Sequence, residues 1–562
     1  MENKDLKTMP GYFEGVKKLT TRTGISVKES YGPNDFKESS FDYENDLGDP
    51  GKYPYTRGLF RNMYRGRLWT RRGLVGFGTP KQTNERLKFQ MDHGLTGLSI
   101  ARDNPTLLCI DSDHPLAKHD VGKAGVPFCS LKDIEIIADG INLEQVSTLI
   151  LAASWSSPPA FCEFLALAEN RGYDIRKMRG TISNYSLSPV VFHPGSMTVY
   201  PVYFLLKLST DVIEFCAKEM PLWYTGVADG YNLRECGISA AEEIGFTLAM
   251  AMAEIEPSLK RGLNIDQIAP RRTFFMSADI DIFEEAAKFR AMRRMWARIM
   301  KDRYGAKDPK SMQYHVAAQT AGSSLVAQEP INNIVRVSYE ALAAVLGGVQ
   351  SLNLCGYDEP VALPSELSHR IEQRTAEILA YETGVTIVAD PLGGSYYIEW
   401  LTDKLEDEAT KILQDIDSKG GWLGVIESGQ MQNRLEEARL EYDRRVQSGE
   451  LPVVARNIYP TEEATSIIPG GVQEISVDLV QKHIASVKEL KKTRDLNKTR
   501  EAIRYLFKRA SLGENENLIR PMVEAFKAYA TIGEVMGTIR VACGLSFDPF
   551  NIVESPFIDE YK

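Results

Sequence analysis

The chain has 562 residues, and its 66 Lys and Arg against 76 Asp and Glu give a formal net charge of −10 at pH 7. Hydrophobic residues make up 43% of it and charged residues 25%, a composition that is ordinary for a globular protein and excludes a disordered or fibrous chain. The acidic total argues against general binding of nucleic acids or membranes. Because there is no long apolar run and no signal peptide, we expect a cytoplasmic protein.

The first 50 residues are polar and rich in turn signals, so we expect an N-terminal arm over 1–50. The next stretch departs from the average charge, because there is no Asp or Glu between Gly51 and Asn84. It contains six arginines, which are Arg57, Arg61, Arg65, Arg67, Arg71 and Arg72. Arginine forks bind phosphate oxygens in pairs, so this stretch indicates a phosphorylated ligand. A solvated or interface surface is the alternative, and RNA binding is disfavoured because no RNA-binding motif is present.

Short strand-like runs follow at regular intervals, separated by amphipathic segments. The eight runs are Gly97–Ala101, Val146–Ala152, Gly180–Ser183, Tyr224–Ala228, Thr273–Ser277, Gln313–Ala318, Val349–Leu354 and Thr386–Ala389. From Ile282 to Ile299 apolar residues step by three and four, the period of a helix. Ser239 and Glu242 have the spacing of a capping box, which opens a helix.

Strand and helix alternate eight times, which predicts an α/β fold, a (β/α)8 TIM barrel over residues 51–400. An open doubly wound sheet is the alternative. Several predicted strands carry small or polar residues such as Thr181 and Ser183, where a filled barrel carries Val, Ile and Leu. Such a lining would leave room along the barrel axis. Residues 401–562 are rich in charge and are expected to form a mainly helical region for docking or dimerisation.

In a barrel of this kind the site lies at the C-terminal ends of the strands. Polar residues stand at these ends, among them Arg102, Asp229 to Glu235, Gln319 and Glu359. The seven cysteines are scattered and never spaced as CxxC, so we expect buried thiols and no metal site. No phosphate-binding or nucleophile motif is present. The residue pattern alone therefore predicts a barrel with a phosphorylated ligand and does not reach a reaction.

Long segments of the chain resemble one known family. They are YPYTRGLFRNMYRGRLWTRRGLVGFGT, DNPTLLCIDSDHP, IDQIAPRRTFF, QTAGSSL, ALPSE, DPLGGSYYIEWLT and GGWLGVIESGQMQ. These segments are similar to the large subunit of adenosylcobalamin-dependent acyl-CoA mutases, the methylmalonyl-CoA mutase family. The resemblance implies an intramolecular transferase with a barrel whose bore is threaded by the coenzyme A arm. It also implies homolysis of a Co–C bond, removal of a substrate hydrogen, migration of a group to the adjacent carbon and return of the hydrogen.

The resemblance assigns roles to two sets of residues. The positions that match acyl-CoA-binding residues are Arg67, Thr70, Arg72, Ser99, Thr181, Tyr231, Arg271 and Thr273. Among them, Arg67 and Arg72 are implied to meet the coenzyme A phosphates. The positions that match residues facing the corrin and the adenosyl group are Glu235, Gln319, Gly322 and Glu359.

The family binds cobalamin through a DxHxxG motif, and this sequence contains none. The resemblance therefore leads us to expect a separate small cobalamin-binding subunit. We also expect a homodimer of large subunits within a heterotetramer, and the region after residue 400 is the expected docking and dimer region.

Four positions that bear on catalysis and substrate choice depart from the family's methylmalonyl enzyme. Leu74 replaces a tyrosine, and His193 replaces the arginine that binds the free carboxylate. Asn232 replaces the histidine that polarises the thioester carbonyl, and an asparagine can donate a hydrogen bond but cannot exchange a proton. Arg102 stands where the family usually has an aromatic residue. Methylmalonyl-CoA is therefore disfavoured as the substrate.

Two kinds of acyl group stay open. If Arg102 receives a carboxylate and Leu74 leaves space, the substrate is a bulky branched or aryl-substituted dicarboxylic acyl-CoA, such as a benzylmalonyl-CoA and phenylsuccinyl-CoA pair. The alternative is an acyl group without a second carboxylate, as in isobutyryl-CoA or 2-hydroxyisobutyryl-CoA mutases, and we favour the dicarboxylic substrate. For Arg102 itself, an ion pair with Asp103 or another carboxylate is the alternative to a substrate-binding role. Ala101 argues against the 2-hydroxy substrate, because that enzyme has an aspartate there. A non-catalytic acyl-CoA-binding paralogue is a further alternative, suggested by Asn232 and opposed by Gln319 and Glu359.

Overall fold

The computed structural model describes residues 19–28, 30–38, 41–95, 97–123, 125–151, 155–184, 187, 200–362, 364–460 and 476–561. The contacts within the chain divide it into two compact units. Unit 1 comprises Met1–Thr70, Asp229–Ala249 and Phe274–Gln473, and unit 2 comprises Arg71–Ala228, Met250–Thr273 and Glu474–Lys562. The domain limits expected at residues 50 and 400 stay predictions.

The central feature of the fold is a nine-stranded sheet, in the order β7-β6-β5-β4-β3-β11-β10-β9-β8. Its strands are β3 (Thr70–Val75), β4 (Gly97–Ala101), β5 (Ser147–Leu151), β6 (Gly180–Ile182), β7 (Trp223–Tyr224), β8 (Gly226–Asp229), β9 (Arg272–Ala278), β10 (Val316–Thr320) and β11 (Ser351–Asn353). The pairings from β3 to β7 and from β9 to β11 are parallel. The outermost strands, β7 and β8, are separated in the chain by Thr225 alone, so together they occupy one position of a nearly closed barrel.

Hydrogen bonds on both sides of this interrupted strand support the closure within unit 2. The Thr225 N–H donates to the carbonyl of Arg271 at 3.0 Å, and the Val227 N–H donates to the carbonyl of Ser183 at 2.9 Å. The α/β barrel expected from the sequence is therefore confirmed, and the open doubly wound sheet is not what forms.

Seven of the eight predicted strands overlap strands of the sheet. The prediction of a strand at Thr386–Ala389 was wrong, because this segment forms turns that leave Ile387 and Val388 exposed. The missing strand is β3, which lies inside the arginine-rich stretch. Its sequence, TRRGLV, carries two arginines and lacks the apolar pattern by which a buried strand is identified.

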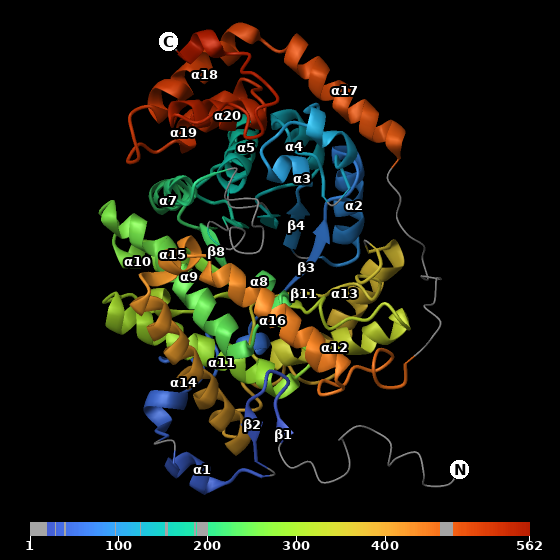
Figure 1. The fold of residues 1–562 in the computed structure, drawn as a ribbon, viewed down its shortest axis with the longest axis vertical. Coiled ribbons are helices and arrows are strands. Elements are labelled where there is room, and N and C mark those ends of the chain that lie inside the picture. The colour runs from blue at the N-terminus through green and yellow to red at the C-terminus, as the bar shows by residue number, and fades with distance from the viewer. Residues whose placement is uncertain are drawn as a thin grey trace. The chain divides into compact units, whose positions relative to one another are not determined.

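Unit 1 contains β10, β11, most of β9 and several helices. They are α1 (Pro33–Glu38), α8 (Tyr231–Glu235), α11 (Ile282–Arg298), α12 (Asn333–Leu346), α13 (Glu366–Tyr381), α14 (Tyr396–Ser418), α15 (Gly421–Glu427) and α16 (Gln430–Gln447), preceded by the antiparallel strands β1 (Leu19–Thr20) and β2 (Ser26–Val27). The predicted helix from Ile282 is α11, and it packs along α14 (Figure 1).

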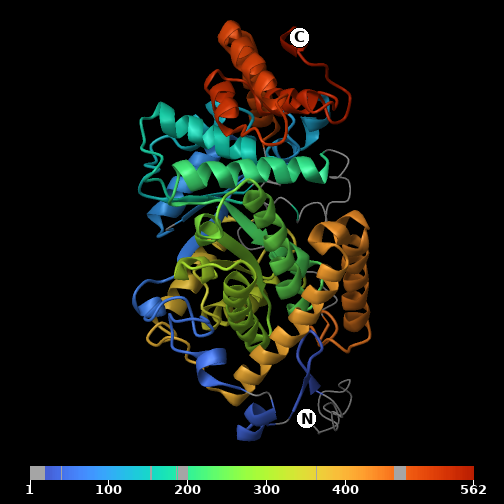
Figure 2. The ribbon, with the colours of Figure 1, turned by 90° about the vertical axis from the view of Figure 1, so that its left-hand side faces the viewer.

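Unit 2 contains helices from the first part of the barrel and from the end of the chain. They are α2 (Pro80–Asp92), α3 (Asn104–Leu107), α4 (Leu131–Ile137), α5 (Ser157–Asn170), α7 (Val202–Glu219), α10 (Ile265–Ile268), α17 (Val477–Thr493), α18 (Leu496–Ala510), α19 (Ile519–Lys527) and α20 (Ile532–Ala542). The C-terminal helices, drawn in red in Figures 1 and 2, include α19, which packs on α5. The helical C-terminal region is thus confirmed.

Helix α9 (Ala240–Lys260) runs across the boundary between the units. It begins at the predicted capping box, in which the Ser239 N–H donates to Glu242 Oε2 at 2.8 Å and the Glu242 N–H donates to Ser239 Oγ at 3.2 Å. Among the described helices none has both the length and the apolar character needed to cross a membrane.

Candidate active site

In unit 2 the register of the strands aligns five residues in one row across the sheet. Leu74 pairs with Ser99, Ser99 with Leu149, Leu149 with Thr181, and Thr181 with Tyr224. Residues in register point to the same face of a sheet. This row therefore forms one continuous wall.

The Leu74 end of the wall faces away from α2. A Cβ on Gly73, the residue before Leu74, would lie 2.8 Å from Oε1 of Gln90 on α2. The face of β3 opposite to Leu74 therefore faces α2. Leu74 is 41% exposed, although a filled barrel would bury it. The Ser99 hydroxyl is buried and has no hydrogen-bond partner among the described residues. The wall is thus open to a ligand and offers a free hydroxyl.

Arg72 lies two residues before Leu74 and so belongs to the same face. Its guanidinium donates to the carbonyl of Leu98 and to Ser147 Oγ, each at 3.2 Å. Burial lowers its pKa to about 10, so it keeps its charge at neutral pH. Thr70 opens β3, and Arg67 precedes it with an exposed side chain in unit 1.

At the other end of the wall, Arg271 and Thr273 meet the interrupted strand. The Arg271 guanidinium lies 5.4 Å from the centroid of the Tyr224 ring, a cation–π arrangement. The Thr273 hydroxyl donates to the carbonyl of Gly226 at 3.1 Å. The structure therefore places Arg72, Ser99 and Thr181 along one wall of unit 2, with Arg271 and Thr273 at its far end. His193 lies outside the described residues.

Arg102 does not face an open space. It is 1% exposed and forms an ion pair with the fully buried Glu163 of α5. It also donates to the carbonyl of Phe128 at 2.9 Å, and its guanidinium lies 4.3 Å from the centroid of that ring. Burial raises the pKa of Glu163, and Arg102 opposes that rise. The ion pair that the sequence left open is thus present, with Glu163 rather than Asp103 as its partner.

In unit 1 a second group gathers at the ends of β8, β10 and β11. Gln319 Nε2 donates to the Tyr231 hydroxyl at 2.9 Å, and Asn353 Nδ2 donates to Gln319 Oε1 at 2.9 Å. The Tyr231 ring packs against Phe275, with 4.8 Å between the ring centroids. Because both ends of its amide are bonded, Gln319 is held in one orientation. Asn353 was not identified from the sequence, although it stands near the end of a predicted strand.

Gly322 lies where three members of this group converge. A Cβ added there would lie 3.3 Å from Glu235 Oε2, 3.7 Å from the Tyr231 hydroxyl and 3.8 Å from Glu359 Cγ. The Ser323 N–H donates to Glu235 Oε2 at 2.7 Å. The four predicted cofactor-facing residues thus form one cluster with Tyr231.

Both carboxyl groups of this cluster are perturbed. Burial raises the pKa of Glu235 to about 7, with Asp279 adding to the rise and hydrogen bonds from Ser323 opposing it. Loss of solvation, together with the carboxylates of Glu372 and Asp358, raises the pKa of Glu359 to about 7. Such carboxyl groups are able to donate as well as accept a hydrogen bond near neutral pH, which suits the recognition of hydroxyl groups.

Asn232, on the first turn of α8, is bonded to the last residue of β8. Its Nδ2 donates to Asp229 Oδ2 at 2.7 Å, and its backbone N–H donates to Asp229 Oδ1 at 3.1 Å. Asp229 is fully buried.

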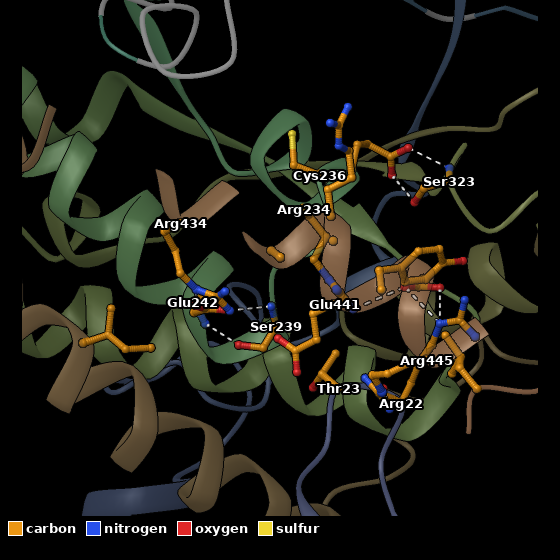
Figure 3. Close-up of a pocket in the computed structure, with 18 residues that line it drawn as sticks. Arg22, Thr23, Arg234, Cys236, Ser239, Glu242, Ser323, Arg434, Glu441 and Arg445 are labelled. Carbon is orange, nitrogen blue, oxygen red and sulfur yellow. Dashed lines mark hydrogen bonds and ion pairs between the residues drawn. The ribbon is translucent and has the colours of Figure 1, made fainter. Parts of the chain in front are cut away.

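A cavity of about 420 Å³ in unit 1 borders the same cluster and is lined in part by Glu235 and Ser323 (Figure 3). Arg22, from the turn between β1 and β2, pairs with Asp279 at 3.1 Å, and Asp279 also pairs with Arg234 at 3.2 Å. The turn between β1 and β2 therefore contributes to the lining of this cavity, which the sequence pattern did not indicate.

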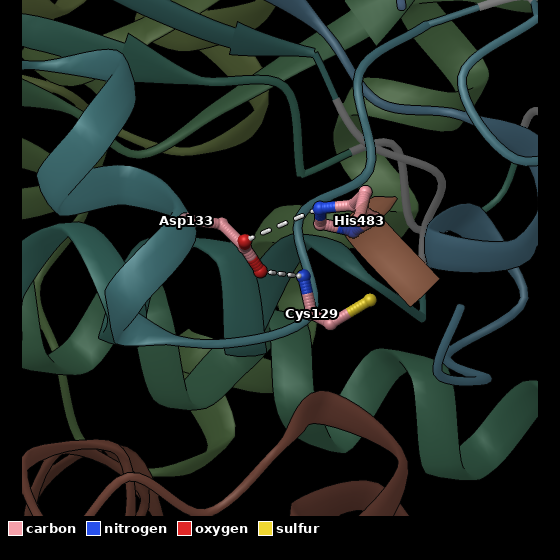
Figure 4. A group of neighbouring side chains, drawn as sticks. All are labelled: Cys129, Asp133 and His483. Carbon is pink, nitrogen blue, oxygen red and sulfur yellow. Dashed lines mark hydrogen bonds and ion pairs between the residues drawn. The ribbon is translucent and has the colours of Figure 1, made fainter. Parts of the chain in front are cut away.

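A third group, in unit 2, contains Cys129, Asp133 and His483, all buried (Figure 4). Asp133 Oδ2 accepts the Cys129 N–H at 2.9 Å, and the Ser112 hydroxyl lies 3.0 Å from Cys129 Sγ and 3.2 Å from His483 Nε2. Burial raises the pKa of the Cys129 thiol. These hydrogen bonds explain why the three side chains lie together. Through His483 they also attach α17 to Ser112.

Residues 20–545 match the sequence profile of methylmalonyl-CoA mutase. The chain belongs to the methylmalonyl-CoA mutase family. A large subunit of 2-hydroxyisobutanoyl-CoA mutase from Aquincola tertiaricarbonis is 36% identical over 516 residues, which cover 92% of this chain and 90% of that one. A methylmalonyl-CoA mutase of Rhizobium meliloti is 36% identical over 93% of this chain and 72% of its own length, and the human mitochondrial methylmalonyl-CoA mutase is 34% identical over 93% and 68%.

This membership in the methylmalonyl-CoA mutase family confirms the resemblance noted from the sequence and identifies the chain as a member of a family of intramolecular transferases. The individual roles assigned to its residues stay predictions.

Proposed function

We propose that this chain is the large, substrate-binding subunit of an adenosylcobalamin-dependent acyl-CoA mutase. The observation that carries the proposal is the convergence of Tyr231, Glu235 and Glu359 on Gly322. A side chain at this position would fill the space between these groups, so the glycine leaves a cradle at the strand ends. The coverage of a relative that is itself named a large subunit supports a partner that binds the cobalamin.

The residues present fit the implied cofactor. Hydroxyl groups of an adenosyl ribose are suitable partners for Glu235 and Glu359, which are partly protonated near neutral pH. Bound adenosylcobalamin would supply the radical chemistry that begins with removal of a substrate hydrogen. Gln319, fixed by Asn353 and Tyr231, would orient groups beside it, and the surrounding protein would keep water away from the reacting atoms.

For the acyl group we propose a bulky branched or aryl-substituted chain. Leu74 supports this, because an exposed aliphatic side chain on the wall offers apolar contact without a hydroxyl. A dicarboxylic acyl group such as benzylmalonyl-CoA or phenylsuccinyl-CoA needs a cationic partner as well. Arg102 does not supply it, since its guanidinium is bonded to Glu163.

The Arg102–Glu163 pair therefore favours a second candidate, an acyl group without a second carboxylate. Isobutyryl-CoA and 2-hydroxyisobutyryl-CoA are of this class, and the Aquincola relative is named for the 2-hydroxy compound. Ala101 offers no acid for a substrate hydroxyl, so isobutyryl-CoA or another unsubstituted branched acyl-CoA fits the described wall better.

The test is to mix the full chain with a cobalamin-binding subunit, adenosylcobalamin and one acyl-CoA at a time. The panel contains methylmalonyl-, benzylmalonyl-, phenylsuccinyl-, isobutyryl- and 2-hydroxyisobutyryl-CoA. We expect a Co(II) signal by electron paramagnetic resonance and an isomeric thioester by mass spectrometry with isobutyryl-, benzylmalonyl- or phenylsuccinyl-CoA, rather than with methylmalonyl-CoA. If acyl-CoA binds but neither signal appears with any thioester, the non-catalytic paralogue is the correct description.

A further inference from the structure

Asp229 is fully buried and is bonded to Asn232, which follows the cluster residue Tyr231 in the chain. It is the last residue of β8, and both of its carboxylate oxygens accept hydrogen bonds from Asn232. A carboxylate only accepts, so the nitrogen of the Asn232 amide, and not its oxygen, must face Asp229.

Helix capping explains one of these two bonds. Asp229 Oδ1 accepts the backbone N–H of Asn232 at 3.1 Å, which satisfies a free donor in the first turn of α8. The bond from Asn232 Nδ2 to Oδ2, at 2.7 Å, is the shorter of the two and adds nothing to the cap. It fixes a side chain rather than the helix.

The remaining atoms of the amide are uncommitted. Within the part of the chain that the structure describes, Asp229 is the only hydrogen-bonding partner of the Asn232 side chain. Its second N–H and its Oδ1 therefore stay available. Without Asp229 the amide could turn over and present its oxygen in place of its nitrogen.

We propose that Asp229 is a positioning residue that holds the Asn232 amide so that its second N–H reaches the thioester carbonyl of a bound acyl-CoA. The inference rests on the proposed function, because it needs an acyl-CoA whose thioester lies beside α8. In this arrangement Asp229 fixes the Asn232 amide, and the amide presents a hydrogen-bond donor to the carbonyl oxygen. An inverted amide would set its oxygen against the carbonyl oxygen and repel it.

Infrared difference spectroscopy on isobutyryl-CoA carrying 13C at the thioester carbonyl tests this without turnover. The probe is bound to the full chain in the absence of cobalamin. We expect the labelled carbonyl band to move to lower wavenumber on binding. Asp229→Asn should lose most of that shift, while the Kd for the probe changes by a smaller factor than the shift does. Asp229→Asn keeps one oxygen for the cap and replaces the second acceptor with a donor.

Asp495→Asn is the matched control, since Asp495 caps α18 by accepting the Lys498 N–H at 3.1 Å and lies on a different helix. Its band should match that of the unmodified chain. An equal shift in the unmodified chain and in Asp229→Asn overturns the inference, as does an unshifted band in the unmodified chain. If the probe does not bind the unmodified chain at all, the proposed acyl-CoA site is wrong instead.

Asn232→His gives a second measurement should Asp229→Asn fail to fold. A histidine beside the buried carboxylate would have a raised pKa, because the negative charge stabilises the imidazolium. The carbonyl shift in this variant should therefore persist well above pH 6.5, the ordinary value for histidine. A shift that disappears at the ordinary histidine pKa would show that Asp229 does not hold the side chain at 232.

Discussion

Arg102 shows how the partner of a single side chain bears on the choice between two proposed substrate classes. From the sequence, an arginine at the end of a strand was compatible with a carboxylate-binding role and with an ion pair. What could not be predicted was Glu163, 61 residues further along the chain, because its position in the middle of a helix gives no sign that it faces a strand end. The residues of the cofactor-facing cluster were found from the resemblance, whereas Asp229 and Asn353 required the hydrogen bonds to be seen.

The buried pair makes a prediction about stability. Arg102→Met would leave the Glu163 carboxylate buried without its cation, and removing one member of a buried pair costs about 3–5 kcal/mol. We expect the free energy of unfolding, from urea titrations followed by circular dichroism, to fall by roughly this amount. The double change Arg102→Met with Glu163→Leu should recover much of the loss, and a double variant as unstable as the single one would contradict the pairing.

Glu235 makes a prediction about pH. Its pKa is about 7 in the folded chain, against roughly 4.3 for an unperturbed glutamate. Between these values the folded state binds the proton and the unfolded state does not, so stability falls as the pH rises from about 4.5 to about 7. Glu235→Gln removes this titration. The Tm of the variant relative to the unmodified chain should therefore increase from pH 5 to pH 8, and a constant difference would refute the assignment.

At the scale of elements, α17 is attached to unit 2 by contacts of different kinds. Val480 and Ile484 pack with Ile110, Ala117 and Val121. Lys491 pairs with Asp111 at 2.9 Å and with Asp113 at 2.7 Å. The charge-rich region after residue 400 was correctly predicted to be helical, because its amphipathic period is strong. The sequence could not indicate which strands and loops the helix would cover, because packing partners distant in the chain leave no local pattern.

Loosening this attachment should be measurable. Ile484→Ala removes buried methyl groups, and such changes cost about 2–5 kcal/mol. We expect α17 to be cleaved faster in limited proteolysis, while a neighbouring exposed change, Lys488→Ala, leaves the cleavage rate unaltered. Equal protection of both variants would mean that the apolar contacts do not hold the helix.

At the scale of the whole molecule, the barrel was predictable because a repeated alternation of strands and helices survives errors in single elements. One strand was misplaced to Thr386–Ala389 and one, β3, was missed, yet the architecture was correct. The misassignment has a physical reason, since β3 carries Arg72 on the face of an open wall instead of an aliphatic residue. The net charge of −10 gave no hint of this arginine-rich strand.

The share of each relative that this chain spans bears on the functional test. The chain spans 90% of a large-subunit relative but 72% and 68% of two methylmalonyl-CoA mutases. The reconstitution described above includes a separate cobalamin-binding subunit because the proposed function calls for one. Omitting that subunit while keeping free adenosylcobalamin is its sharpest control.

The turn between β1 and β2 has a practical consequence for anyone who prepares this protein. Arg22 shares Asp279 with Arg234, whose neighbour in the chain is Glu235. A shortened version that begins after residue 28 would remove one of the two cations from Asp279 and open one side of the cavity. An affinity tag is therefore better added in front of the β1–β2 segment than used to replace it.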